Sequence, residues 1–159
     1  MILSHCSHET VLHVARNMRD RDKQEIYNVR WHDSPFDLMN AVMSQRDFAW
    51  VAWLDGAPVA VFGGIPAHPG VWNMFAFATD AFPRLALGLT RFATKTVIPT
   101  LFQQMEAHRL QCDSHEKHTD AHQWLERMGA RRESVKVAFG KDGADYFTYT
   151  VTKKSTKST

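Results

Sequence analysis

The stretch Thr119–Ala130 constrains the fold more than any other, because it has a recognisable start, period and stop. Thr119 or Asp120 can serve as the N-cap, accepting a backbone N–H group that the first turn of a helix leaves without a partner. Four small or apolar side chains recur at helical spacing, namely Ala121, Trp124, Leu125 and Met128. Gly129 then occupies the position after the helix that favours a left-handed backbone. The sequence therefore predicts a short helix with defined ends.

Strands are predicted on both sides of this helix. The brief apolar run Arg109–Cys112 precedes it, and Ser134–Phe139 follows it with alternating small or apolar and polar residues. A further strand is predicted over Asp145–Thr152, where the alternation suits a strand with one wet face. Lys141-Asp142-Gly143 supplies the turn between the last two strands, which we expect to pair as an antiparallel hairpin.

The N-terminal part predicts one strand followed by three short helices. Ile2–Cys6 is the strand, and Ser7 caps the first helix. The charged segment Asp20–Arg30 predicts a second, frayed helix over the surface. A cap, an N1 proline and an acidic residue in Ser34–Asp37 mark the start of the third. These helices precede the main sheet in the chain.

The clearest hairpin of the sequence follows these helices. Two aromatic and β-branched runs, Phe48–Leu54 and Ala57–Phe62, flank the dipeptide Asp55-Gly56, which favours a type I′ turn. Gly63-Gly64 is expected to end the second strand, because paired glycines permit a bulge or the close approach of another backbone. The hairpin predicts an antiparallel start to the sheet.

A strand and a long helix are predicted in the middle of the chain. Val71–Ala78 reads as the strand, and Thr79–Pro83 as the rim that leads into the helix. Pro99 should kink that helix or divide it in two, because proline lacks the N–H group that an interior position needs. The residues expected to face the core are Leu85, Leu89, Phe92, Leu101, Phe102 and Met105.

Length and composition narrow the class of protein. A chain of 159 residues with 44% hydrophobic and 23% charged residues predicts one globular domain over 1–152, with a disordered polar tail over 153–159. A net charge of +2 without a concentrated basic face argues against nucleic acid. Two cysteines, Cys6 and Cys112, cannot form a disulfide framework, and no long apolar run indicates a membrane span. A reducing cytoplasm is the expected compartment.

The order of elements and the helix ending in Met128-Gly129-Ala130 resemble the GNAT (Gcn-related N-acetyltransferase) fold. The late helix of that family commonly reads Asn-x-x-Ala-x-x-x-Tyr-x-x-x-Gly-Phe. The corresponding residues here are His118, Ala121, Leu125, Gly129 and Ala130. The resemblance implies an α/β (α+β) fold with a mixed central sheet of about six to seven strands. Flanking helices and two splayed parallel strands in the middle of the sheet complete the expected architecture.

A narrower resemblance concerns the small GNAT-like internal virion or assembly proteins of podovirus-type (short-tailed) bacteriophages. It covers about Val51 to Lys153 and rests on short matches. These are Trp124-Leu125, Met128-Gly129-Ala130, Lys141-Asp142-Gly143, Tyr149–Lys153, Gly63-Gly64 and Thr79-Asp80. The resemblance implies the cytoplasm of an infected host cell, or the virion, as the location.

The GNAT resemblance also implies a co-substrate, acetyl-CoA. In the family the pantetheine arm enters the gap between two parallel strands, and the pyrophosphate lies on the N–H groups that begin the following helix, where the dipole favours anions. Phe75–Phe77 and Leu110–Cys112 correspond to the two strands here, and Phe82–Gly88 to the start of the helix. The implied cofactor-binding residues are Phe75, Ala76, Phe77, Ala78, Thr79, Phe82, Arg84, Leu85, Gly88, His118, Ala121 and Trp124.

Acetyl transfer to an amine requires a neutral amine and an acid for the leaving thiolate. The tyrosine that commonly serves as the acid in the family is replaced by Leu125, and Ser114, His115 and His118 are the substitutes predicted here. No glutamate lies on the central strands to act as the base. The polar candidates for this role are Asp47, His68, Asn73 and Asp80.

The histidines near the predicted helix have a second interpretation. Cys112, His115, His118 and His122 have a spacing that could bind zinc. We favour a solvated histidine-rich loop without a metal, because Cys112 is expected to end a core strand and His122 to lie on the exposed side of the helix.

Two functions remain open from the sequence. The first is a phage-encoded GNAT-type N-acetyltransferase that modifies an amine of a host protein or a small molecule. The second is a non-catalytic GNAT-fold virion or assembly protein that holds a protein partner, which the replacement of tyrosine by Leu125 favours. Binding of acetyl-CoA and transfer of its acetyl group are the properties that distinguish the two.

Overall fold

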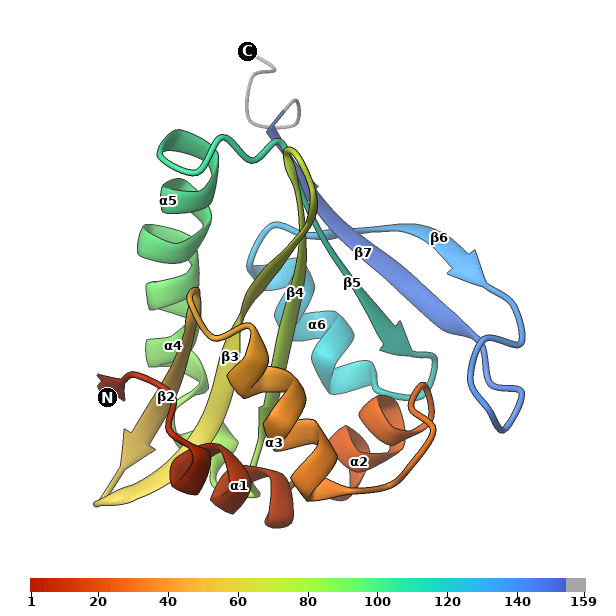
Figure 1. Ribbon diagram of the computed structural model, residues 1–159. Helices are drawn as coiled ribbons and strands as arrows, with labels where there is room; N and C mark the ends of the chain where they lie inside the picture. The colour runs from red at the N-terminus through yellow and green to blue at the C-terminus, as the bar shows by residue number, and fades with distance from the viewer. Residues whose placement is uncertain (154–159) are drawn as a thin grey trace. The chain divides into compact units, whose positions relative to one another are not determined.

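The computed structural model describes residues 1–153 of the chain, and Figure 1 labels most of its helices and strands. Seven strands form one mixed sheet in the order β1-β2-β3-β4-β5-β7-β6, which confirms the predicted fold class. The strands are β1 (Ile2–Ser4), β2 (Ala49–Leu54), β3 (Ala57–His68), β4 (Val71–Ala78), β5 (Arg109–His115), β6 (Arg131–Lys136) and β7 (Tyr146–Thr152). The helices are α1 (His8–Arg16), α2 (Asp20–Tyr27), α3 (Pro35–Ser44), η1 (Phe82–Arg84), α4 (Ala86–Phe92), η2 (Ala93–Val97), α5 (Ile98–Gln103) and α6 (Thr119–Arg127).

The chain forms two compact units. The first comprises Met1–Ile65 and Phe75–Leu89, and the second comprises Pro66–Met74 and the chain from Thr90 onward. The single domain expected over 1–152 stays a prediction. Of the tail expected over 153–159, only Lys153 is described, and the rest lies outside the described residues. Among the described residues, no helix is both long and apolar enough to cross a membrane.

In the first unit the predicted caps begin two helices. The Ser7 hydroxyl accepts the N–H of Thr10, and the Thr10 hydroxyl accepts the N–H of Ser7, so the two residues form a capping box. The Ser34 hydroxyl likewise accepts the N–H of Asp37 at the start of α3, next to Pro35 at the first helical position. Local sequence chemistry therefore fixes where α1 and α3 begin.

The β2–β3 hairpin turns as predicted but is longer than predicted. Asp55 and Gly56 have φ values of 52° and 79°, as a type I′ turn requires. The prediction that Gly63-Gly64 ends the second strand was wrong, because β3 continues to His68. A Cβ atom on Gly63 would lie 2.7 Å from the Cα of Ala49 on β2, so glycine permits the close approach of the two backbones without ending the strand.

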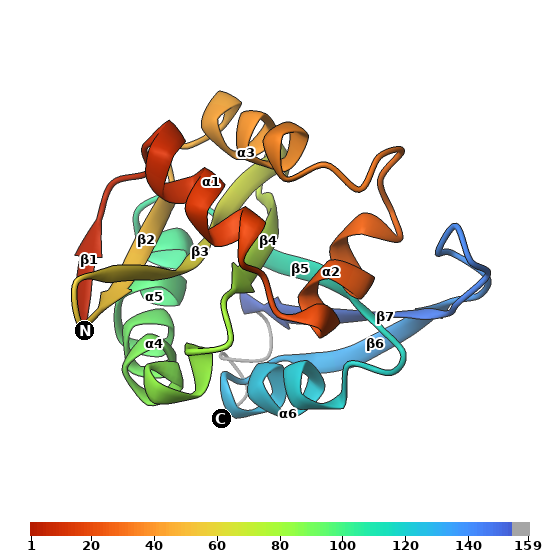
Figure 2. The ribbon, with the colours of Figure 1, turned by 90° about the horizontal axis from the view of Figure 1, so that it is seen from below.

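The core of the first unit lies where α1 and α3 pack together, side by side in Figures 1 and 2. Apolar side chains from both helices and from β2, β3 and β4 form one buried cluster. It includes Val11, Val14, Ala15, Leu38, Met39, Val42, Val51, Val61 and Phe77. This cluster fixes α1, and with it the corner that leads into α2, against the strands.

The long helix accommodates its proline with a π-helical turn. η2 lies between α4 and α5, and it ends at the residue before α5, the helix that contains Pro99. The helical path therefore continues through Pro99, because the wider turn absorbs the missing N–H group. Leu101 and Phe102 are buried as predicted, whereas Met105 lies beyond the end of α5 and is exposed, so its predicted place in the core was wrong.

In the second unit β7 lies between β5 and β6, antiparallel to both, which confirms the predicted terminal hairpin. The predicted bounds were wrong for two strands. β5 continues past Cys112 to His115, and β6 spans Arg131–Lys136, so it begins and ends three residues before the predicted Ser134–Phe139. The wet face expected for β7 was also wrong, because Thr148 and Thr150 are buried beneath charged side chains of β5 and β6.

The helix α6 ends as the sequence predicts and begins differently. The N–H of Gly129 donates to the carbonyl of Glu126, the N–H of Ala130 donates to that of Leu125, and Gly129 has a φ of 95°. These bonds form a Schellman motif. The N-cap is His118 rather than Thr119 or Asp120, and its side chain makes no capping hydrogen bond. The predicted cap was therefore wrong by one or two residues.

Candidate cofactor and acyl-transfer site

The parallel ladder between β4 and β5 is short. It runs from Val71 opposite Arg109 to Asn73 opposite Gln111. Both strands continue beyond this ladder, β4 to Ala78 and β5 to His115. Pairing confined to the first part of the two strands is what the resemblance predicts for the splayed pair of the sheet. The side chains of Asn73 and Gln111 also hydrogen-bond to each other at 2.9 Å, where the ladder ends.

The far end of β4 is held by the corner between α1 and α2. The carboxylate of Asp22 accepts the N–H of Ala78 at 2.8 Å, and the Ala78 carbonyl accepts the N–H of Arg19 at 2.9 Å. The Arg19 guanidinium pairs with the same carboxylate at 2.9 Å and lies over the ring of Phe82. Asp22 is only 2% exposed. The helix corner therefore satisfies a peptide group that a neighbouring strand would otherwise bind.

Ala78 is not the only residue of β4 whose peptide group faces this edge, because peptide groups alternate between the two edges along a strand. The N–H of Thr79 donates to the carbonyl of Val59 on β3, whereas Ala78 points its N–H and C=O to the opposite edge. Because successive residues of a strand point their peptide groups to opposite edges, Ala76 directs its N–H and C=O the same way as Ala78. Between the end of the ladder at Asn73 and the contact at Ala78, the peptide group of Ala76 therefore faces the edge of β4 that is turned away from β3.

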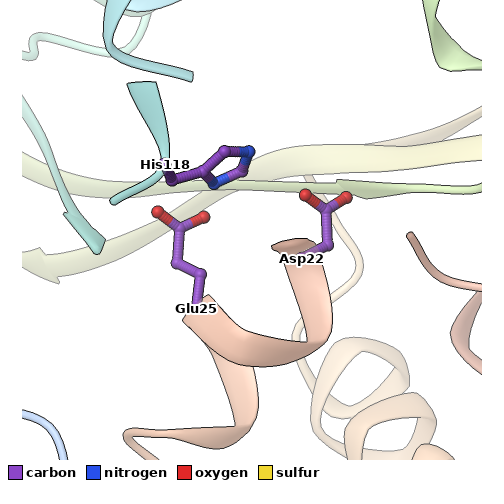
Figure 3. A group of neighbouring side chains, drawn as sticks. All are labelled: Asp22, Glu25 and His118. Atoms are coloured by element: carbon purple, nitrogen blue, oxygen red, sulfur yellow. The ribbon is translucent and has the colours of Figure 1, made fainter. Parts of the chain in front are cut away.

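Asp22 and Glu25 project from the same side of α2, as Figure 3 shows. Their carboxylate oxygens lie within 4.8 Å of each other. Because Asp22 also binds Ala78, the carboxylate of Glu25 lies near the end of β4 as well. Two carboxylates so close suit a cation, including a protonated amine. Neither carboxylate was predicted as a site residue, although a spacing of three residues on a predicted helix is a signal for a shared face.

The predicted phosphate-binding segment leads from β4 into the long helix. Phe82 and Leu85 are buried and anchor η1 and the turn after it, while Thr79 is half-buried. Gly88 lies in the first turn of α4, where a Cβ atom would meet only the side chain of Met1 at an ordinary distance of 3.5 Å. Arg84 donates to the exposed Asp55 at 2.8 Å. Phosphate binding by these residues stays a prediction.

The predicted proton donors lie at the end of β5 and the start of α6. Ser114, His115 and His118 are all buried, so the interpretation of a solvated histidine-rich loop was wrong. His122 was expected on the exposed side of the helix and is also buried, because its ring stacks on Tyr149 of β7. Its Nε2 lies 3.0 Å from the carbonyl oxygen of His115, which gives this histidine a packing and hydrogen-bonding role.

Two further residues of the predicted cofactor set lie on α6. Ala121 is half-buried, and the indole N–H of Trp124 donates to the Thr90 hydroxyl on α4 at 2.8 Å. This bond fixes the Trp124 ring against the long helix of the second unit. Leu125, at the position of the usual tyrosine, is half-buried and carries no polar atom.

The residues predicted as candidate bases are dispersed. Asp47 and Asp80 are exposed, and Asn73 binds Gln111 as described above. His68 lies in the second unit, on the wall of a pocket of about 570 Å³. The other residues of this wall are Pro66, Pro69, Gly70, Trp72, Met105, Glu106 and His108. Asn73 lies on β4 and Asp80 lies two residues beyond its end, and Asp47 and His68 lie on other segments.

A charged network crosses the face of the sheet in the second unit. Arg109 on β5 pairs with Glu133 on β6 through two bonds of 2.7 and 2.8 Å, and Glu133 also accepts from Thr150. The register of β6 on β7 shifts at this point, which places an extra residue there and turns Glu133 toward Arg109. The hydrogen bond from Arg109 lowers the pKa of Glu133, and the same bond raises the pKa of Arg109.

This pair predicts a small loss of stability in acid. Because the folded-state pKa of Glu133 lies below the ordinary value of 4.5, its contribution is complete above that value and is lost as the pH falls through the folded pKa. We expect Glu133→Gln to remove less than about 1 kcal/mol at pH 7, since the pair is partly exposed. Urea unfolding at pH 7 and pH 3 measures this difference, with Glu126→Gln on α6 as the control. An equal loss at both pH values would contradict the assignment.

Comparison with solved structures finds the same fold in acetyltransferases. A GNAT-family acetyltransferase from Bacillus anthracis is 13% identical with a TM-score of 0.68, over 96% of this chain and 94% of that one. A ribosomal-protein-alanine N-acetyltransferase from Brucella melitensis is 12% identical with a TM-score of 0.73, over 96% and 99%. AAC(6')-Ib, solved with ribostamycin and coenzyme A, is 16% identical with a TM-score of 0.69, over 99% and 96%.

No protein-family model and no curated protein matches the sequence. The structural similarity is nevertheless extensive, since it covers nearly the whole of this chain and of the solved proteins. The protein therefore has the GNAT acetyltransferase fold, as its resemblance to that family predicts. Identities this low establish the fold and leave the activity to be argued from the site.

Proposed function

We propose that the protein transfers an acetyl group from acetyl-CoA to an amine. The observation that carries this proposal is the edge of β4, where the parallel ladder stops at Asn73 and Asp22 occupies the edge again at Ala78. The peptide group of Ala76 lies between these two points. An amide-containing arm such as pantetheine can add there through the hydrogen bonds of a strand.

The segment after β4 supports the position of the phosphates. The helical path from Ala86 to Gln103 is long enough for its dipole to favour an anion at its first turn, where Leu87 and Gly88 lie. Gly88 leaves the backbone of that turn accessible to a phosphate group. The resemblance assigns the pyrophosphate to the same segment.

Glu25 is the base that this placement favours. Its carboxylate lies within 4.8 Å of Asp22, which itself binds the end of β4. We assign the base to Glu25 rather than to Asp22, because Asp22 is held by Arg19 and by the N–H of Ala78. Ser114, His115 and His118 remain the predicted groups for the departing thiolate.

The finer features of the proposal come from the phage resemblance. We propose a phage-encoded enzyme that acts in the cytoplasm of the infected host, or travels in the virion, and modifies an amine of a host protein or a small molecule. The alternative is a GNAT-fold binding protein without catalysis. Leu125 favours this alternative, because a leucine cannot supply the proton that the usual tyrosine supplies.

Thermal unfolding with acetyl-CoA tests the cofactor site. At 100 times its dissociation constant, acetyl-CoA should stabilise the protein by about 2.7 kcal/mol. Ala76→Pro should abolish this shift, because proline lacks the N–H group at the edge of β4 that does not face β3. The unfolding temperature of the variant without ligand is the control for its fold. No shift with the wild-type protein would contradict the cofactor site.

Release of free thiol from acetyl-CoA tests the reaction. The acceptors to be tried are a peptide with an N-terminal alanine, a lysine peptide and ribostamycin, since the solved proteins of this fold include an alanine N-acetyltransferase and a complex with ribostamycin. Acceptor-dependent thiol release supports the acetyltransferase. A thermal shift without transfer to any amine would support the binding protein instead.

A further inference from the structure

The pocket that His68 lines is formed entirely by the second unit. One side of it is the turn that joins β3 to β4, and the other is the segment that joins α5 to β5. Its volume of about 570 Å³ falls within the range of about 300–1,000 Å³ that is usual for small-molecule sites. The pocket is therefore large enough for a small organic ligand.

The frame of this pocket is fixed by backbone hydrogen bonds. The carbonyl oxygen of Gly70 accepts the N–H of His108 at 2.8 Å and that of Arg109 at 3.1 Å, which ties the β3–β4 turn to the start of β5 (Figure 1). The His108 carbonyl accepts the N–H of Lys153 at 3.0 Å. Gly70 has a φ of 83°, and a Cβ atom there would overlap the imidazole ring of His108, so this ring lies directly against the turn. These contacts form the pocket before any ligand binds.

Glu106 in the pocket wall has a backbone conformation that is unusual for a glutamate. Its φ of 56° lies in the left-handed region, which glycine and asparagine adopt more readily. The residues on either side are held by the chain before them. The N–H of Met105 donates to the Thr100 carbonyl at 3.2 Å, and the N–H of Ala107 donates to the Leu101 carbonyl at 2.9 Å. A charged residue held in a strained conformation at a pocket indicates a function for its carboxylate.

The polar groups of the wall are one carboxylate and two imidazoles. The carboxylate is that of Glu106, and the imidazoles are those of His68 and His108. No lysine or arginine of the described chain lines the pocket. Within residues 1–153 the Glu106 side chain makes no hydrogen bond or ion pair. A carboxylate without a partner in a pocket that lacks basic side chains attracts a cation.

The composition of the wall decides which kind of cation fits. A metal ion is disfavoured, because among the described residues Glu106, His68 and His108 do not bring their ligand atoms as close together as one ion requires. The indole of Trp72 and the thioether of Met105, which is 44% exposed, favour an apolar group next to the charge. An ammonium group on an apolar stem meets both conditions.

We propose that this pocket binds an organic ammonium ion, with the charge at Glu106 and the apolar stem against Trp72 and Met105. The proposal does not depend on the proposed acetyl transfer. Neither Glu25 nor any residue predicted to bind acetyl-CoA lines the pocket. The site is therefore a second one, and its occupation can be measured without acetyl-CoA.

Nuclear magnetic resonance of the nitrogen-15-labelled protein, titrated with n-butylammonium at low salt, tests the site. The backbone amides of Gly70, Met105 and His108 and the indole N–H of Trp72 should shift and saturate. The matched ligands are 1-butanol and pentanoate, which carry the same butyl group without a positive charge. Each should bind at least about fivefold more weakly, the ratio expected for one accessible ion pair. Equal binding of 1-butanol, or tighter binding of pentanoate, would overturn the proposal.

Two substitutions of Glu106 separate binding from folding. Glu106→Gln removes the charge and keeps the shape of the side chain, and should raise the Kd for n-butylammonium about fivefold. Glu106→Gly removes the carboxylate together with the backbone strain, so it should bind as weakly and unfold at no lower temperature than the wild type. Glu126→Gln, on the exposed side of α6, is the control and should leave the Kd unchanged. A wild-type Kd in both Glu106 variants would show that the carboxylate does not hold the ligand.

Discussion

Replacement of Asp22 by alanine is expected to lower the free energy of unfolding by about 3–5 kcal/mol. The side chain is 2% exposed, pairs with Arg19 and accepts the N–H of Ala78. Its removal leaves a guanidinium that is only 16% exposed without its partner, and a strand N–H without its acceptor. Urea unfolding followed by circular dichroism measures the loss.

Two other variants separate the charge of Asp22 from its position on α2. Asp22→Asn keeps an acceptor for Ala78 and loses the charge, so its effect should lie between that of alanine and the wild type. Asp20→Ala removes an exposed acid from the first turn of the same helix and should cost no more than about 1 kcal/mol. We call the contacts of Arg19 and Asp22 with Ala78 the clasp on β4. Equal effects of Asp20→Ala and Asp22→Ala would show that this clasp contributes nothing to stability.

Gly63→Ala is expected to destabilise the protein by about 3 kcal/mol. The new Cβ would lie 2.7 Å from the Cα of Ala49 and closer still to the carbonyl oxygen of Phe48. Both are backbone atoms, so no rotation of a side chain relieves the overlap and the two strands must move apart. The loss is measured by urea unfolding, and a lower yield of folded protein is expected with it.

Gly88→Ala is the control for this substitution. A Cβ at that position meets only the flexible side chain of Met1, and the residue lies in a helix, where alanine is favoured over glycine by about 1 kcal/mol. The control should therefore be neutral or slightly stabilising. A loss at Gly63 no larger than at Gly88 would contradict the close approach of β2 and β3.

The sequence predicts the elements whose ends are set by local chemistry. Ser7 and Ser34 begin their helices, Asp55-Gly56 makes the hairpin turn, and Gly129 ends α6, because each satisfies nearby backbone groups or adopts a particular φ. The bounds of β5 and β6 were wrong, since polar residues such as Ser114 and Glu133 are buried or held by partners distant in the sequence. Pattern alone carries no information about such partners.

The site was predictable in outline only. The resemblance places the free edge on β4, and the short ladder in the structure agrees with it. The clasp by Arg19 and Asp22 was missed, because the charged segment Asp20–Arg30 reads as a solvated surface when its contact with Ala78 is unknown. The buried positions of His115 and His122 were missed for a related reason, since histidine is compatible with both a wet loop and an aromatic stack.

The clasp on β4 has a consequence for ligand selection. With one end of this edge paired with β5 up to Asn73 and the other bound by Asp22 at Ala78, an extended ligand would have only a short stretch of β4 on which to pair. An extended ligand that pairs with so short a stretch is expected to bind in one register, whereas a long exposed edge allows several. The affinity of a compound for this edge should therefore depend on the spacing of its amide groups. Alkyl chains of equal length, which cannot form these hydrogen bonds, should not bind there.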